Sequence, residues 1–128
     1  MVNMDEKNEQ LLRIEIQTES MYLPINHIEE IIEIEYIKLL PCMKKNVIGL
    51  TLIKNSVLPV ISFDENFNLP TVGIVLKNNR RKYFLQVSSV KNISNMNIGN
   101  FEKTEHNYIL RSGENKIIDT EKISRILF

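Results

Sequence analysis

The stretch that decides the fold is VIGLTLIKNSVLPVI, residues 47–61. Its two apolar runs, residues 47–53 and 57–61, have the length and the β-branched content of buried strands. Lys54-Asn55-Ser56 lies between them and predicts a turn, because asparagine tolerates a positive φ and serine can bond its own backbone. The stretch therefore predicts a β-hairpin, in which Pro59 indicates an edge strand or a bulge.

The chain after this hairpin continues as short apolar runs separated by turns. The strands predicted there are residues 72–76, 83–87, 108–111 and 116–118. The Asn-rich segment 92–105 shows no period, and we expect it to be irregular. Asp119 or Thr120 is expected to cap a short C-terminal helix, with Ile123, Ile126 and Leu127 on one face.

The chain before the hairpin begins with a polar segment and then alternates. Residues 12–16 and 21–25 place apolar and polar side chains in turn, which predicts a second hairpin around the turn 18–20. Residues 1–10 show no period, so we expect a flexible lead-in to one domain over residues 11–128.

The segment between the two hairpins contains a possible helix start. Asn26 is a good helix N-cap, so Ile28, Ile31 and Ile32 are expected on one face of a short helical turn. The many short strands and turns of the whole chain predict a mainly β barrel or sandwich with little helix.

The charge balance excludes several classes of function. The chain has 128 residues, with 16 basic and 16 acidic side chains. This balance argues against a dedicated nucleic-acid binder and against an electrostatic membrane binder.

The longest apolar runs are only a few residues, so we expect no membrane insertion. The N-terminus lacks an apolar signal segment and Cys42 is the one cysteine, which together predict a cytoplasmic location.

The residues that usually carry chemistry do not form a recognisable active site. The four glycines are isolated, so the sequence contains no Gly-rich phosphate loop. His27, His106 and Cys42 do not have the spacing of a zinc site, and His27 is expected in a surface or capping role. We therefore predict no catalytic residue, no metal and no cofactor. The basic cluster at residues 80–82 is expected to be a solvated hairpin tip.

Six short motifs occur in a characteristic order over residues 22–61. They are YLPI at 22–25, IEEI at 28–31, LP at 40–41, VIG at 47–49, KN at 54–55 and VLPVI at 57–61. In this order the chain resembles the CheW-like domain family, the coupling proteins of bacterial chemotaxis arrays. Weaker similarity continues through LQVSSV at 85–90 and IIDTEKI at 117–123.

The chain also departs from the family pattern at four positions. The Arg-Gly turn of the family is Lys54-Asn55 here, and Ser62 and Ser88 stand where the family has Asp. Lysine keeps the positive charge of arginine but lacks its planar, bidentate group. These differences are typical of a divergent member.

The resemblance implies a fold of two packed, five-stranded, SH3-like β-barrels with short helices and a shared core. It also implies a non-catalytic adaptor that binds the regulatory domain of a CheA-type histidine kinase and the cytoplasmic tip of a chemoreceptor. Ile28 would supply apolar area, Glu30 a negative charge and Lys54 a positive charge. The full set of residues expected to contact partners is Ile28, Glu30, Lys54, Asn55 and Val57.

Three other readings of the sequence stay open. The chain could be a degenerate CheW-like module that serves another kinase or a scaffold. It could also be a small β-barrel that binds single-stranded nucleic acid by stacking bases on aromatic side chains, such as Tyr36, Tyr83, Phe84 and Tyr108. An enzyme would need a pocket with convergent polar groups, and the sequence names none.

Overall fold

The computed structural model describes residues 7–41, 44–106 and 108–128, so Cys42 and the first six residues lie outside the described part. The elements in chain order are β1 (Asn8–Ile16), β2 (Glu19–Pro24), η1 (Ile25–His27), β3 (Ile28–Ile34), β4 (Lys38–Leu39), β5 (Val47–Ile53), β6 (Ser56–Ile61), β7 (Thr71–Asn78), β8 (Arg81–Gln86), β9 (Ser89–Asn97), β10 (Glu102–Lys103), β11 (Ile109–Ser112), β12 (Asn115–Ile118) and the helix α1 (Thr120–Leu127).

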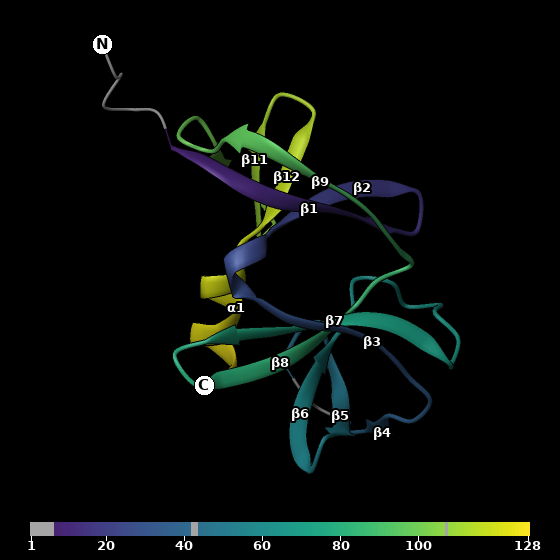
Figure 1. The fold of residues 1–128 in the computed structure, drawn as a ribbon. Coiled ribbons are helices and arrows are strands. Elements are labelled where there is room, and N and C mark those ends of the chain that lie inside the picture. The colour runs from purple at the N-terminus through teal and green to yellow at the C-terminus, as the bar shows by residue number, and fades with distance from the viewer. Residues whose placement is uncertain (1–6, 42–43, 107) are drawn as a thin grey trace.

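The strands form two sheets, each in its own lobe (Figure 1). The first lobe has the order β10-β11-β12-β2-β1-β9, and so combines the two ends of the chain. The second lobe has the order β3-β7-β8-β6-β5-β4 and uses the middle of the chain. Each sheet has five strands of at least four residues and one edge strand of two residues. The predicted fold class, mainly β with two packed lobes and little helix, is confirmed.

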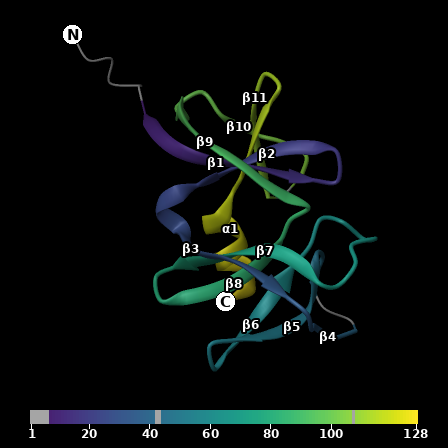
Figure 2. The ribbon, with the colours of Figure 1, turned by 45° about the vertical axis from the view of Figure 1, so that its right-hand side comes forward.

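The two lobes share one apolar core. Buried side chains of the first lobe, such as Ile14 and Leu23, pack with Tyr83 and Leu85 of the second. The helix α1 adds Ile123 to this cluster and lies beside both lobes (Figure 2). Because the core spans the junction, burial of apolar surface holds the lobes together.

A smaller core fills the second lobe, and it depends on one glycine. Val60, Val75 and Phe84 belong to this core. A Cβ atom on Gly73 would lie 2.0 Å from Cζ of Phe84, so only glycine leaves room for the ring.

Several sequence predictions are confirmed at the level of single elements. The 47–61 stretch is the β5–β6 hairpin, and Asn55 has a φ of 68° in its turn. The predicted first and last hairpins are β1–β2 and β11–β12. Asp119 caps α1, since its side chain accepts a hydrogen bond from Lys122 N at 3.1 Å.

The helical turn predicted after Asn26 is wrong. The residue that precedes the short 3-10 helix η1 is Pro24, and residues 28–34 form strand β3. Four of the seven residues of β3 are isoleucine, whose branched Cβ favours a strand. Backbone pairing of β3 with β7 then completes the strand.

The segment 92–105 is also more regular than its sequence predicts, because β9 covers residues 89–97. In the pairing of β9 with β1, Lys91 and Asn92 are both opposite the single residue Arg13, so β9 has a β-bulge there. The extra residue interrupts the alternation of apolar and polar side chains that would have indicated a strand. The same pairing brings residues 8–10, assigned to a lead-in, into β1.

Pro59 predicted an edge strand or a bulge; the edge strand is wrong, and the bulge of this hairpin lies on β5, where the register shifts between Val47 and Gly49. Strand β6 lies between β5 and β8 in the sheet. Its pairs with β8 are Val60–Phe84 and Ile61–Leu85, so they begin one residue after the proline. A proline is tolerated there because the hydrogen-bonded pairing of β6 with β8 does not include residue 59, so no N–H is needed at that position.

Candidate partner-binding surface

The β5–β6 turn presents Lys54 to solvent. Lys54 and Asn55 both have positive φ angles, 46° and 68°. A two-residue loop with two positive φ angles matches the twist of a hairpin, so the strands continue without distortion. The Lys54 side chain is 76% exposed, and its charge is therefore available to a partner.

The structure brings Lys54 to Glu30 of β3. Lys54 Nζ lies 3.1 Å from Glu30 Oε1. Strands β7 and β8 separate β3 from β6 in the sheet order, so the sheet must curl for this contact to form. The ion pair thus joins two motifs that are distant in the sequence.

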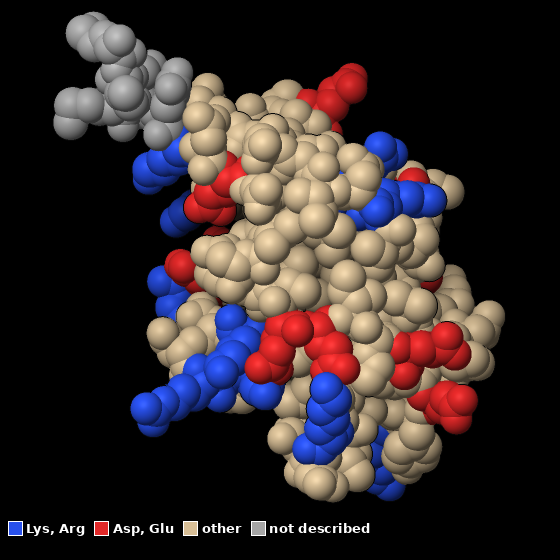
Figure 3. Space-filling model, viewed as in Figure 1, with Lys and Arg blue, Asp and Glu red and all other residues tan. Residues whose placement is uncertain are grey.

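A β-bulge directs the neighbouring carboxylate elsewhere. The register of β3 against β7 shifts between Ile28 and Glu30, which leaves Glu29 as the extra residue. Glu29 Oε2 lies 2.8 Å from Lys82 Nζ. The hydrogen bond from Lys82, with further attraction from nearby lysines, holds the pKa of Glu29 below its ordinary value. Figure 3 shows acidic and basic side chains alternating on this face of the second lobe.

An exposed apolar pair lies on the outer side of the same hairpin. Val57 and Leu52 are opposite each other in the β5–β6 register, and they are 63% and 65% exposed. Leu50 and Pro59, the next cross-strand pair on this side, are half-buried. A contiguous apolar strip beside charged residues is typical of a protein-binding surface.

Four of the five predicted contact residues lie on or beside the hairpin turn, and the fifth differs. Glu30 and Lys54 form an ion pair, Asn55 is the second residue of the turn, and Val57 follows it in β6. Ile28 is half-buried and packs against the shared core. Only its remaining surface is open to a partner.

Sequence reasoning missed one member of this surface, Leu52, and one ion pair beside it, Lys82 with Glu29. Leu52 could have been found, since Val47, Gly49, Thr51 and Ile53 alternate with it and are buried. Lys82 could not, because its partner Glu29 is set by a bulge that has no local signature. We define the contact surface as Ile28, Glu30, Leu52, Lys54, Asn55 and Val57.

Comparison with known proteins agrees with the motif order described above. Residues 10–123 match the family model described as the CheW-like domain. The chain belongs to the CheW-like domain family. The search of curated proteins finds no match. Among solved structures, the chain is similar to the scaffolding protein TtCheW from Thermoanaerobacter tengcongensis, with a TM-score of 0.67, 16% identity and 88% of each chain covered. At this identity the similarity shows the fold, and the family is one of chemotaxis adaptors.

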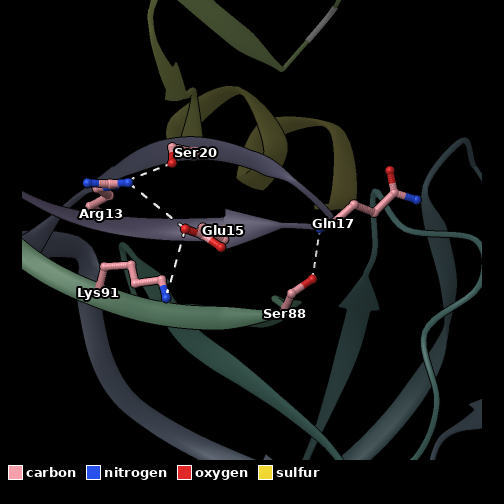
Figure 4. A network of polar contacts seen from close by, with 6 residues as sticks. All are labelled: Arg13, Glu15, Gln17, Ser20, Ser88 and Lys91. Atoms are coloured by element: carbon pink, nitrogen blue, oxygen red, sulfur yellow. Dashed lines mark hydrogen bonds and ion pairs between the residues drawn. The ribbon is translucent and has the colours of Figure 1, made fainter.

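The two serines that replace family aspartates have structural roles in this CheW-like domain. Ser88 Oγ accepts a hydrogen bond from Gln17 N at 2.8 Å (Figure 4). Ser88 N also donates to Glu15 O at 2.8 Å. The side chain of Gln17 then donates to Asp64 Oδ1 at 3.0 Å. These bonds connect the tip of the β1–β2 turn to the second lobe.

Ser62 is buried and belongs to a second polar group. Its hydroxyl lies 3.0 Å from Gln86 Oε1 and 2.8 Å from Asp64 O. The Gln86 amide in turn donates to Thr71 Oγ1 at 3.2 Å. Because these buried polar groups are paired with one another, Ser62 satisfies local hydrogen bonds in place of a carboxylate.

The placement of the aromatic residues does not support binding of single-stranded nucleic acid. Of the four aromatic residues named for this function, Tyr83, Phe84 and Tyr108 are buried in the cores and cannot stack on bases, and Tyr36, at 67%, is the exposed one. In the basic turn, Lys82 pairs with Glu29, and the guanidinium of Arg81 lies over the Phe128 ring at 5.4 Å. In the portion of the chain described here, no helix is long and apolar enough to span a membrane.

His27, expected in a surface or capping role, makes a part-buried contact with the C-terminal helix. Its Nδ1 atom lies 2.7 Å from Thr120 Oγ1 in the first turn of α1. This contact ties η1, and with it the start of β3, to the C-terminal helix. His27 therefore helps to position the strand that carries Ile28 and Glu30.

Proposed function

We propose that this CheW-like domain is a non-catalytic adaptor that couples a CheA-type histidine kinase to chemoreceptors in the cytoplasm. The observation that carries the proposal is the Glu30–Lys54 ion pair beside the exposed pair of Leu52 and Val57. Apolar area with a few placed charges supports protein binding, since burial supplies affinity and charge supplies selectivity.

The two kinds of contact suit the two partners differently. Leu52 and Val57 form part of an apolar strip on a sheet, which fits the flat face of a kinase regulatory domain. Glu30 and Lys54 form an exposed ion pair, which fits a receptor tip with an acidic residue for Lys54. In such an assembly the adaptor places the kinase where a change in the receptor can bias it.

The proposal is tested by titrating the full chain with the regulatory domain of the kinase from the same genome, and separately with a receptor cytoplasmic fragment. Val57→Lys is expected to weaken kinase binding at least about tenfold, because it puts a solvated charge into an apolar contact. Leu69→Lys is the matched control, since Leu69 is an exposed apolar residue of the same lobe outside the strip. Failure of the parent chain to bind either partner at about 50 μM would overturn the proposal.

A further inference from the structure

The segment after β10 contains a hydrogen bond that only a neutral histidine accepts. Tyr108 N donates to His106 Nδ1 at 3.1 Å. An imidazole nitrogen accepts a hydrogen bond only while it carries no proton, so the proton of the neutral ring must be on Nε2. Protonation at Nδ1 would set the new N–H of His106 against the N–H of Tyr108, and two donors cannot bond to each other.

Other hydrogen bonds in this segment hold the backbone around the histidine. His106 N donates to Thr104 Oγ1 at 3.0 Å, and the same hydroxyl oxygen lies 2.9 Å from Ile109 O. Ile109 N in turn donates to His106 O at 3.3 Å. A proton on Nδ1 is therefore accommodated in one of two ways: the ring rotates out of its place, or these bonds break and the segment opens.

The ring of His106 also connects this segment to the second lobe. Its centroid is 5.3 Å from that of Phe63, which lies two residues after β6, and 5.8 Å from that of Tyr108. Tyr108 belongs to the shared core, and Phe63 is packed against it. Asp64, the charged neighbour of Phe63, is bonded to Gln17. Because the histidine ring lies where the two lobes meet, its displacement removes a contact between them.

The surroundings of His106 favour the neutral ring. Burial lowers the pKa of His106 below its ordinary value of 6.5, and Lys45, in the loop before β5, lowers it further. Glu19 of β2 acts in the opposite direction, but its carboxylate forms an ion pair with Lys116 of β12. The remaining charges on the wall of the adjoining cavity, which has a volume of about 1000 Å³, balance one another: Glu102, Glu105, Lys103 and Arg111.

We propose that His106 is a pH-sensitive latch at the junction of the two lobes. When the ring is uncharged, Tyr108 N–H is bonded to it and Phe63 is packed beside it. When Nδ1 takes up a proton from solvent, the bond to Tyr108 is lost and the contact with Phe63 loosens. Because the pKa is lowered in the folded chain, the latch is complete above pH 6.5 and is lost as the pH falls through the lower, folded value. This inference does not depend on the adaptor function, since it concerns the junction of the lobes and not the contact surface.

An NMR titration of the full chain from about pH 8 to about pH 5 tests the proposal. The ring of His106 is expected to titrate with a midpoint below 6.5. Protection of the Tyr108 amide, corrected for the pH dependence of hydrogen exchange itself, is expected to fall at least about tenfold through the same midpoint. The cross-peak between the rings of Phe63 and His106 should weaken with it. Amides of β1, which is paired on both sides, should keep their protection.

Two variants separate the latch from a general effect of acid. In His106→Asn the side-chain oxygen accepts a hydrogen bond from Tyr108 N–H and does not titrate, so Tyr108 should be protected over the whole pH range. His106→Ala removes the acceptor and should leave the Tyr108 amide unprotected throughout. A His106 midpoint above 6.5 would overturn the proposal. So would a Tyr108 amide that stays protected below the midpoint in the parent, or a response to pH in His106→Asn equal to that of the parent.

Discussion

Lys54 Nζ lies 3.1 Å from Glu30 Oε1, although the two residues belong to strands that are not neighbours in the sheet. The pair is mostly solvated on the lysine side, so its contribution to stability is small. Its position at the tip of a rigid hairpin makes it better suited to selecting a partner.

The first prediction separates these two roles. Lys54→Glu is expected to weaken binding of the receptor fragment about tenfold, since it removes the cation and adds a like charge beside Glu30. The free energy of unfolding in urea should change by less than about 1 kcal/mol. The exchange Glu30→Lys with Lys54→Glu restores the internal pair. If that double variant also restores binding, the pair acts only within the chain and the contact role of Lys54 is wrong.

The second prediction concerns Gly73. Gly73→Ala is expected to destabilise the chain by about 3 kcal/mol, because the new methyl group would overlap the buried Phe84 ring. Gly113→Ala is the control, since Gly113 has a φ of 59° and open space around it, and it should cost only about 1 kcal/mol. Urea denaturation measures both. Equal losses in the two variants would show that the ring moves aside freely.

The third prediction concerns the start of α1. Asp119→Ala should cost about 1 kcal/mol of stability, because Lys122 N loses its acceptor at the helix N-terminus. Asp119→Asn keeps an acceptor oxygen and should lose much less. The variants are compared by thermal and urea unfolding. An alanine variant as stable as the asparagine variant would rule out a capping role.

The fourth prediction concerns acid. The pKa of Glu29 is lowered in the folded chain, so its stabilising effect is present above the ordinary value of 4.5 and is lost as the pH falls through the lower, folded value. Glu29→Gln should therefore lose less stability than the parent between pH 5 and about pH 3. Lys82→Met removes the main cause of the lowered pKa and should raise the titration midpoint of Glu29 measured by NMR. An unchanged midpoint would contradict the assigned cause.

Local sequence was sufficient wherever an element depends on its own residues. Alternation over residues 12–16 and the apolar run 47–53 predicted strands, and Asp119 or Thr120 predicted the helix start. The order of short motifs predicted the family. These features were accessible because side-chain period, turn residues and caps act over a few positions.

Elements that depend on a distant partner were not predicted. The bulge at Lys91 and Asn92 obscured the period of β9, and pairing with β1 determines that strand. The sequence of β3 predicted a helical turn, whereas in the structure its backbone hydrogen-bonds to β7 and forms a strand. In both cases the pairing partner is far along the chain, so no local pattern reports it.

The sequence by itself determined the β-rich class, the hairpin turn at Lys54-Asn55, the capped C-terminal helix and membership of the CheW-like family. Only the tertiary structure decided that Glu30 meets Lys54, that Glu29 turns to Lys82, and that β9 lies at the edge of its sheet. The physical reason is that the curl and order of a sheet arise from pairing between distant segments, whereas a turn or a cap is determined by adjacent residues.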